Sequence, residues 1–224
     1  MNDTVTAKGM MVKAETASAF LQIRNVATPF DNTQPQISAD ADNAEKILHP
    51  TSLVKALSGD TLTPFDGSTI VFVEAHSIDP NNYEKNEEEA YADVTNKAYP
   101  QNDTDGNVYT LINSFYVRLN PDAGLETAAN LKIDSLTITA EDDEKVQLLP
   151  AVRVLIVCGE NKTLWKNGEK VAGADVLAAQ VTTAESEIKV CIFFDGEDAA
   201  TTTVNAAAVD LSGYSVQFKL TVNK

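Results

Sequence analysis

Three carboxylates follow one another closely after an apolar stretch late in this 224-residue chain. Asp195, Glu197 and Asp198 stand in the segment FFDGEDA, directly after residues that have the pattern of a buried strand. Carboxylate oxygens are the ligands that calcium prefers, so this turn is a candidate cation site. In the alternative interpretation, which we favour, Asp198 accepts hydrogen bonds as the N-cap of a short helix that begins at Ala199.

A second group of oxygen ligands lies upstream, in the segment NDTDGN. Asp103, Asp105 and Asn107 alternate along the chain with a glycine among them, and oxygen ligands at that spacing can surround a calcium ion. The distal glutamate of an EF-hand loop is missing, and Asn, Asp and Gly also favour turns. We therefore favour a polar turn here, and we expect no cofactor other than calcium.

The sequence contains no residue set with the spacing of a known catalytic motif. Its two histidines, His49 and His76, do not belong to an H-E-x-x-H pattern, and neither a G-x-S-x-G segment nor a phosphate-binding glycine loop is present. The two cysteines lack the C-x-x-C spacing of zinc and redox sites. We therefore expect that the protein is not an enzyme.

Trp165 is the only tryptophan, and it is the aromatic residue that we consider for ligand contact. It precedes Asn167 and Gly168, a pair that favours a two-residue hairpin turn. An exposed ring beside that turn would be able to contact a glycan or a protein partner. In the other interpretation, which we favour, the ring packs partly against its own hairpin.

Most periodic segments have the pattern of β-strands. Residues 213–223 alternate cleanly, whereas 150–159 and 187–196 are almost continuously apolar and are expected to be central strands covered on both faces. Within 130–140 the alternation changes phase near Asp134, which predicts a β-bulge. Further strands are expected at 18–25, 68–76 and 107–120.

Helix signals are few, and long polar segments separate the strands. We expect two helical turns at 51–59 and one more turn at 205–211, while 81–97 is either a short helix or a solvated insertion. This pattern predicts an all-β protein, a jelly-roll-like β-sandwich with long polar loops and a few short helices.

Cys158 and Cys191 each lie in one of the two most apolar strands. A disulfide would be possible if those strands are neighbours. The alternative, which we favour, is that both residues are buried free thiols that behave as small apolar side chains.

The composition is that of a folded and strongly acidic protein. With 43% hydrophobic and 22% charged residues the chain can bury a core, and its net charge is −16. Such a charge repels nucleic acids and anionic membrane surfaces, so we expect neither as a partner. No stretch approaches the roughly 20 apolar residues that span a bilayer. A signal peptide is not recognisable, so the protein is either cytosolic or a mature secreted form whose signal peptide has been removed.

The first residues of the chain alternate in the manner of a half-buried strand. Val5 and Ala7 fall on one side of this strand, and Thr4, Thr6 and Lys8 fall on the other. An N-terminal strand of this kind either closes the sheet of its own subunit or completes the sheet of another.

Gly9 is the expected hinge between two parts of the chain. We assign 1–9 to an arm that is a candidate donor strand, and 10–224 to a single β-sandwich domain. Strand addition across subunits supplies backbone hydrogen bonds and pockets for alternate side chains, and it covers an edge that would otherwise favour aggregation. A head-to-tail contact of this kind does not close on itself, so it yields filaments.

Two segments of the chain together carry a resemblance to a known family. In 2–23 a short polar strand, a glycine and a second strand follow one another, and in 187–222 a buried strand precedes an acidic G-E-D turn and a last alternating strand. Together they resemble the TasA/camelysin-like secreted proteins of Gram-positive bacteria. The resemblance implies a jelly-roll-like sandwich assembled into extracellular fibres of a biofilm matrix, in which the N-terminal strand of one subunit fills a groove in the next.

The leading hypothesis is therefore an extracellular or cell-surface structural protein, a subunit of homopolymeric filaments assembled by donor-strand complementation. The alternative is a secreted or cell-surface β-sandwich module that binds a glycan or host ligand through Trp165. A virion component remains a further hypothesis, because sandwiches with exchanged arms also build capsids. The metallopeptidase activity attached to the camelysin name is not carried over, since no zinc-ligand set is recognisable in this sequence.

Overall fold

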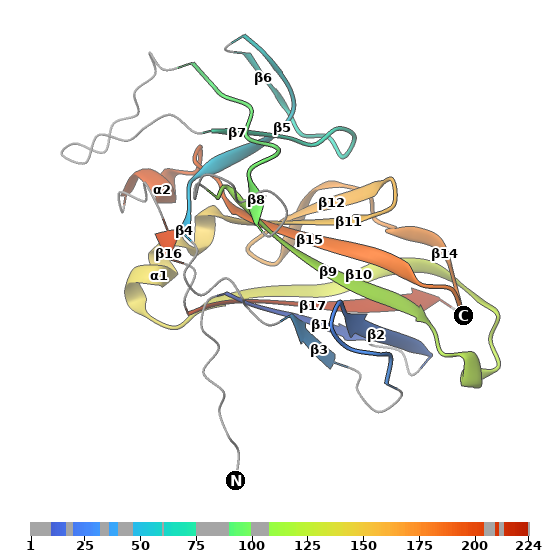
Figure 1. Cartoon of the computed structure of the whole chain (residues 1–224). Coiled ribbons are helices and arrows are strands. Elements are labelled where there is room, and N and C mark those ends of the chain that lie inside the picture. Colours follow the sequence, from blue (N-terminus) through green and yellow to red (C-terminus); the bar gives the residue numbers. More distant parts are fainter. Residues whose placement is uncertain are drawn as a thin grey trace.

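Two large β-sheets pack face to face, and a smaller sheet lies on the outer side of one of them (Figure 1). The structure is a computed structural model, and it describes residues 10–16, 20–31, 36–39, 47–59, 61–74, 90–99, 108–203, 209–210 and 213–223. Strands dominate this part of the chain, and its helices are short. The predicted fold class, an all-β sandwich with a few short helices, is therefore confirmed.

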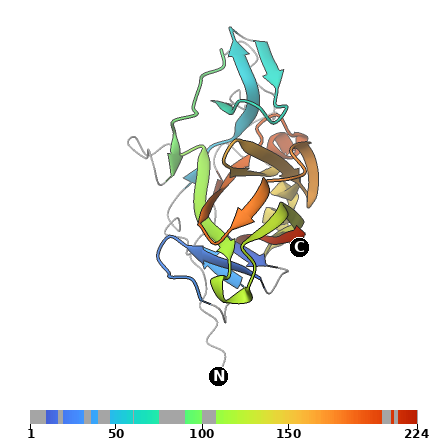
Figure 2. The same cartoon turned by 90° about the vertical axis from the view of Figure 1, so that its right-hand side faces the viewer.

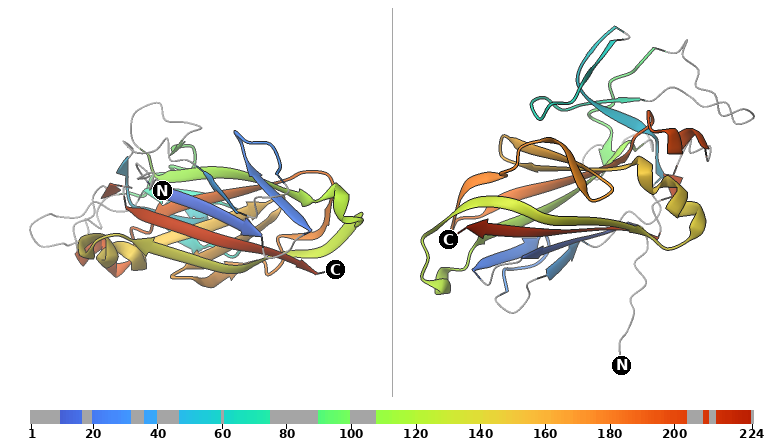
Figure 3. Two further views of the ribbon diagram at one scale, coloured as in Figure 1. Left: turned by 90° about the horizontal axis from the view of Figure 1, so that it is seen from below. Right: turned by 180° about the vertical axis from the view of Figure 1, so that it is seen from behind.

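Sheet A has the strand order β14-β10-β17-β1-β3. Its strands are β1 (Met11–Thr16), β3 (Gln36–Ala39), β10 (Thr127–Ala140), β14 (Ala178–Thr182) and β17 (Tyr214–Asn223). The view from below shows β1, in blue, beside β17, in red (Figure 3). These two strands run parallel, with Met11 opposite Ser215, so the beginning and the end of the described chain are joined in one sheet.

Sheet B has the order β13-β12-β11-β15-β9-β2, and β8 pairs with one end of β9. Its strands are β2 (Leu21–Asn25), β8 (Ala98–Tyr99), β9 (Thr110–Leu119), β11 (Val152–Cys158), β12 (Asn161–Lys166), β13 (Glu169–Gly173) and β15 (Ser186–Phe194). The pairs β9–β15 in sheet B and β10–β14 in sheet A are nested along the chain, as in a jelly roll.

The main core lies between the two sheets and explains the sequence patterns of the central strands. Alternate residues of β17 point into it, including Val216 and Phe218, and the ring of Phe218 meets that of Phe115 edge to face at 5.5 Å. Residues of β11 and β15 are buried on both faces because the small sheet covers the other side of sheet B. These strands were predicted to be central and two-sided, and the prediction is confirmed.

The phase change within β10 is also confirmed as an irregularity of pairing. The register between β10 and β17 shifts between Ile133 and Ser135, where the alternation changes phase in the sequence. A second shift follows Ala129, next to Asn130, whose φ of 57° is unusual for a residue with a side chain.

The small sheet has the order β6-β5-β7, with β5 (Thr51–Ser58), β6 (Thr61–Pro64) and β7 (Val71–Glu74). An outer core joins it to sheet B, where Phe72 meets Phe193 edge to face at 5.1 Å. Figure 2 shows this sheet standing away from the sandwich on one side only. The helix predicted at 51–59 is wrong, because Leu53 and Val54 pair with β7 and pack as a strand.

The remaining elements are short. They are η1 (Pro121–Ala123), α1 (Asp143–Leu148), η2 (Leu149–Ala151), α2 (Ala199–Thr203), and the pair β4 (Ile47–Leu48) with β16 (Val209–Asp210). Residues 90–97 form no helix, and the rest of the segment 81–97 lies outside the described residues. The turn predicted at 205–211 also lies outside them, apart from the two residues of β16. No helix in the described part of the chain has the length and apolar character needed to cross a membrane.

Candidate functional site

The acidic turn after β15 is occupied by cationic side chains of the protein itself. Arg153, on β11, is buried, and its Nη2 atom lies 2.9 Å from Asp195 Oδ2 and 2.8 Å from Asp198 Oδ2. Lys166 Nζ, on β12, lies 2.7 Å from the same oxygen of Asp198. Glu197 is exposed. Two of the three predicted calcium ligands, Asp195 and Asp198, therefore belong to a partly buried ion network around Arg153.

Asp198 also caps the short helix α2. Its Oδ1 accepts a hydrogen bond from the backbone N–H of Ala200 at 3.0 Å, so the capping interpretation of the sequence is confirmed. Burial of the carboxyl group opposes its ionisation, but hydrogen bonds from Lys166, Ala200 and Arg153 outweigh that effect and lower the pKa of Asp198 to about 2. The carboxylate is ionised at neutral pH and stabilises this end of the sandwich.

The other calcium candidates, Asp103, Asp105 and Asn107, lie outside the described residues. Among the residues that the structure describes, no group of three or more His, Cys, Asp or Glu side chains could hold a metal ion.

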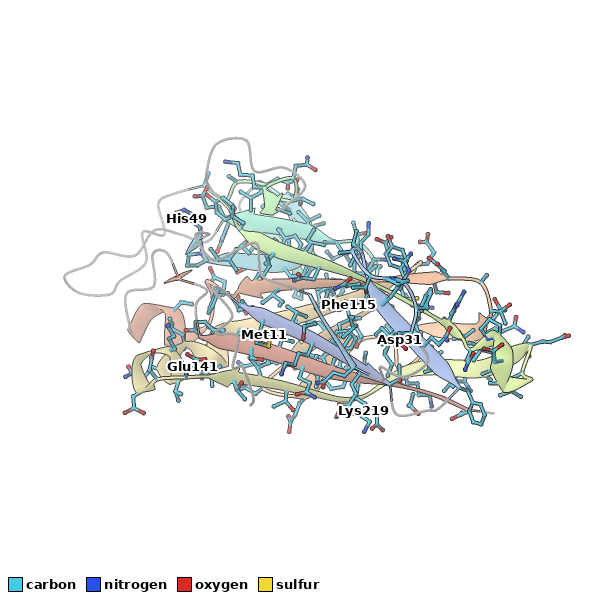
Figure 4. All side chains as sticks on the ribbon, turned by 60° about the horizontal axis from the view of Figure 1, so that its bottom comes forward. Met11, Asp31, His49, Phe115, Glu141 and Lys219 are labelled. Atoms are coloured by element: carbon cyan, nitrogen blue, oxygen red, sulfur yellow. The ribbon has the colours of Figure 1, made fainter. Side chains whose placement is uncertain are left out.

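The chain enters the body of the sandwich at Met10, which is completely buried. The arm residues Thr4, Val5, Thr6, Ala7 and Lys8 and the hinge Gly9 lie outside the described residues. From Met11 the chain continues as β1, beside the start of β17, where the backbone N–H of Glu141 donates to the carbonyl of Gly213 at 3.0 Å. Figure 4 shows Met11 and Glu141 toward one end and Lys219 further along β17.

We call this part of the molecule the helical end, because α1, η2 and α2 cover it together with the turn 195–198 (Figure 1). Tyr214, at the start of β17, joins the two sheets here. Its ring meets that of Phe194 at 5.4 Å, and its hydroxyl donates to the carbonyl of Lys145 in α1 at 3.2 Å. The point where the chain enters is therefore held by helix, sheet and ring contacts.

The opposite end of the sandwich carries a groove of about 550 Å³, and we call it the groove end. The turn after β11, the start of β14 and the start of β15 form its walls, with Glu160, Asn161, Leu177, Ala178 and Glu187 among the lining residues. Within the described residues β14 is the edge strand of sheet A, so one side of its backbone faces no further strand. An exposed edge of this kind can accept an added strand.

The groove end and the point of chain entry lie at opposite ends of the long strand β10. Ala140 pairs with Tyr214 at the entry, whereas Leu131 pairs with Ala178 at the groove. Nine residues of strand separate the two positions, which corresponds to roughly 30 Å. A contact between the arm of one copy and the groove of another would therefore be head to tail.

Trp165 lies on β12, and its ring is half-buried against the main core. The predicted hairpin turn is present, since Asn167 and Gly168 both have positive φ, at 50° and 81°. The ring lines a small cavity together with Thr163 and Lys170.

Cys158 and Cys191 are buried free thiols on neighbouring strands. Cys191 is opposite Leu155, and Cys158 stands three residues further along β11, so the two side chains point to opposite faces of sheet B. Cys158 contributes to the main core and Cys191 to the outer core. Burial raises the pKa of both thiols, that of Cys191 to about 12. The interpretation as free thiols is therefore confirmed.

Sequence reasoning missed Arg153 and Lys166 as the partners of the acidic turn. The available signal was the single arginine inside an otherwise apolar strand, because a charge in a two-sided strand must be paired when it is buried. It also missed the groove end, whose walls come from three separate segments, 157–161, 177–178 and 186–189, that only the fold brings together.

Comparison with protein-family models, with curated proteins and with solved structures gives no match to this chain.

Proposed function

We propose that the protein is an extracellular structural protein, a filament subunit that assembles by donor-strand complementation. The observation that carries the proposal is that the point of chain entry and the groove lie at opposite ends of the sandwich. The chain enters at the helical end, and a groove beside the edge strand β14 lies at the groove end. The TasA-like biofilm fibre suggested by the sequence resemblance is one form that such a filament would take.

The donor in this proposal is the arm of a neighbouring copy. Residues 2–8, fully extended, would reach roughly 23 Å, which suits a strand added along β14. Val5 and Ala7 would face the groove, where Leu177 and Ala178 supply apolar wall. Lys8 would meet a rim that carries Glu160 and Glu187 together with Lys189, whose Nζ atom lies 3.8 Å from Glu187 Oε2.

Self-assembly also agrees with the open edge of sheet A. In the described residues the backbone of β14 is paired only with β10, through pairs that run from Thr127 opposite Thr182 to Leu131 opposite Ala178. An added strand would complete the hydrogen-bond ladder on the other side and remove an aggregation hazard. A repeated head-to-tail contact would then extend without closure.

The first test is negative-stain electron microscopy of the intact protein and of a variant that lacks residues 2–8. We expect filaments from the intact protein and folded monomers from the variant. The truncated subunit would keep its groove, so adding it to intact subunits should cap one end and shorten the filaments. Filaments formed by the truncated protein alone would refute the donor assignment.

A further inference from the structure

A small cavity lies where the chain crosses from β13 in sheet B to β14 in sheet A. Its volume is about 160 Å³. Ile133, Ala174 and Leu177 supply apolar wall, and Thr163, Trp165, Lys170 and Asp175 supply polar atoms. It is separate from the groove, although Leu177 borders both spaces.

Two buried polar atoms beside this cavity are unsatisfied. Thr163 is only 2% exposed, and neither its Oγ1 atom nor the Nε1 atom of Trp165 has a hydrogen-bond partner among the described residues. Buried polar groups are paired in nearly all folded proteins, and leaving one unpaired is unfavourable. The two residues stand two positions apart on β12, so their side chains lie on the same face of the strand and border the same cavity.

Four polar side chains line this cavity, and three of them, those of Thr163, Trp165 and Lys170, can donate hydrogen bonds, whereas the carboxylate of Asp175 can only accept them. The indole N–H of Trp165 is only a donor, the Thr163 hydroxyl can donate, and the Lys170 ammonium is a cation at the rim. Lys170 forms an ion pair with Asp175, whose side chain is 83% exposed. Because the carboxylate of Asp175 stands mostly in water, a competing anion can replace it at Lys170 without burying a charge of the protein.

The size of the cavity limits what it can hold. An engineered cavity of about 150 Å³ binds benzene, so this one has room for a ligand of about six non-hydrogen atoms. An anionic head group would satisfy the donors, and a short alkyl chain would fill the space between Ile133 and Leu177.

We propose that this cavity binds a short-chain carboxylate of about four to six non-hydrogen atoms. The carboxylate oxygens accept hydrogen bonds from Trp165 Nε1 and Thr163 Oγ1 and take the place of Asp175 beside Lys170. The alkyl chain lies against Ile133, Ala174 and Leu177. This binding is independent of filament assembly, since the cavity and the groove use different polar groups.

Trp165 offers a direct measurement, because it is the only tryptophan of the chain. Its emission is followed while butyrate is added at constant ionic strength, with n-butanol and sodium chloride as matched controls. We expect a saturable change with a Kd on the order of 1 mM, whereas n-butanol binds at least about tenfold more weakly because it lacks the charged head group.

Variants then assign the contact. Thr163→Val keeps the shape of the side chain and removes its hydroxyl, and Lys170→Met removes the ammonium, so each should weaken butyrate binding by about tenfold. Thr137→Val, on the exposed side of β10, is the control and should leave the Kd unchanged.

A response that is linear in butyrate, or equal for butyrate and n-butanol, would overturn the proposal and assign the cavity to ordered water. This comparison uses the intact protein, so it decides the question even if a variant does not fold. A rise in the melting temperature with butyrate but not with chloride gives a second measurement on the intact chain.

Discussion

The two ends of the sandwich differ in how their charged side chains are paired. At the helical end the buried charge of Arg153 is neutralised by Asp195 and Asp198, and three short helical segments cover the core. At the groove end the carboxylates of Glu160 and Glu187 line an open groove beside an edge strand. Among the described residues, the buried charge of the helical end is paired within the chain itself, whereas the groove end has an unpaired strand edge beside its carboxylates.

The two ends should differ most in how much the free energy of unfolding falls when one cationic side chain is removed from each. Arg153→Met leaves the carboxylates of Asp195 and Asp198 without their buried partner, and we expect a loss of about 3–5 kcal/mol in the free energy of unfolding. Lys189→Met at the groove should change it by less than about 0.5 kcal/mol, because that side chain is exposed. Urea denaturation measures both, and equal losses would contradict the comparison.

The backbone near the groove end is closely packed around Gly173, and two glycine variants test whether this packing contributes to stability. Gly173, at the end of β13, has a φ of 87°, and an added Cβ would lie 2.1 Å from the carbonyl oxygen of Lys162. Gly173→Ala should therefore cost about 3 kcal/mol through this clash and the strained backbone.

Gly124 provides the matched control for that variant. Its φ is also positive, at 69°, but apart from Gly124 itself and its two chain neighbours no atom lies within 4 Å of an added Cβ. Gly124→Ala should cost only about 1 kcal/mol, the backbone contribution alone. If thermal unfolding shows the same loss for both variants, the close packing around Gly173 does not contribute to stability.

Acid should lower the stability of the helical end, because Asp198 is stabilising there only while its carboxylate is ionised. The pKa of Asp198 is about 2 in the folded protein and about 3.9 in an unfolded chain. Its contribution to stability is therefore complete above the unfolded pKa and is lost as the pH falls from about 4 to about 2. Melting temperatures at pH 5 and at about pH 2.5 should differ less for Asp198→Asn than for the intact protein.

Glu160→Gln, at the groove end, serves as the control for this pH series. Its side chain is exposed, so the intact pH dependence should be retained. A variant of Glu160 that flattens the acid response as much as Asp198→Asn would show that the helical end is not its source.

The smallest effect on stability is expected when a reductant is added, because the two cysteines are free thiols. Because Cys158 and Cys191 occupy opposite faces of sheet B, a reductant should leave the unfolding midpoint unchanged. Maleimide labelling followed by mass spectrometry should find both thiols protected in the folded protein, since each is only 6% exposed. Rapid labelling of Cys191 in native buffer would mean that the small sheet opens readily.

The strands that were predicted correctly are those whose burial follows from local pattern. β17 alternates because one of its faces meets the core, and β11 is continuously apolar because both of its faces are covered. The shift between Ile133 and Ser135 was visible because a bulge changes the phase of the alternation.

The segment 51–59 was mispredicted because its local signals and its tertiary contacts disagree. Hydroxyl residues before an apolar run and a glycine after it are typical of a helix, yet Leu53 and Val54 pair with β7. Strand pairing across about 20 residues leaves no trace in a local pattern, so tertiary contacts override the helix signal.

The features of the candidate sites could be predicted where they depend on adjacent residues and not where they depend on contacts between distant strands. The cap formed by Asp198 followed from adjacent residues, whereas its ion pairs with Arg153 and Lys166 required strands distant in sequence to meet. The cavity beside Trp165 depends on Ile133 of β10 and on Leu177, directly before β14, so no spacing rule could have identified it.

The most direct test of the account joins the arm of one copy to the groove of the next. Ala7→Cys and Ala178→Cys are combined in one chain that also carries Cys158→Ala, which removes the thiol of the groove. Mild oxidation should give a ladder of disulfide-linked oligomers on a non-reducing gel, while each single cysteine stops at the dimer. Only monomers and dimers from the combined variant, under conditions in which filaments are visible, would contradict donor-strand assembly through this groove.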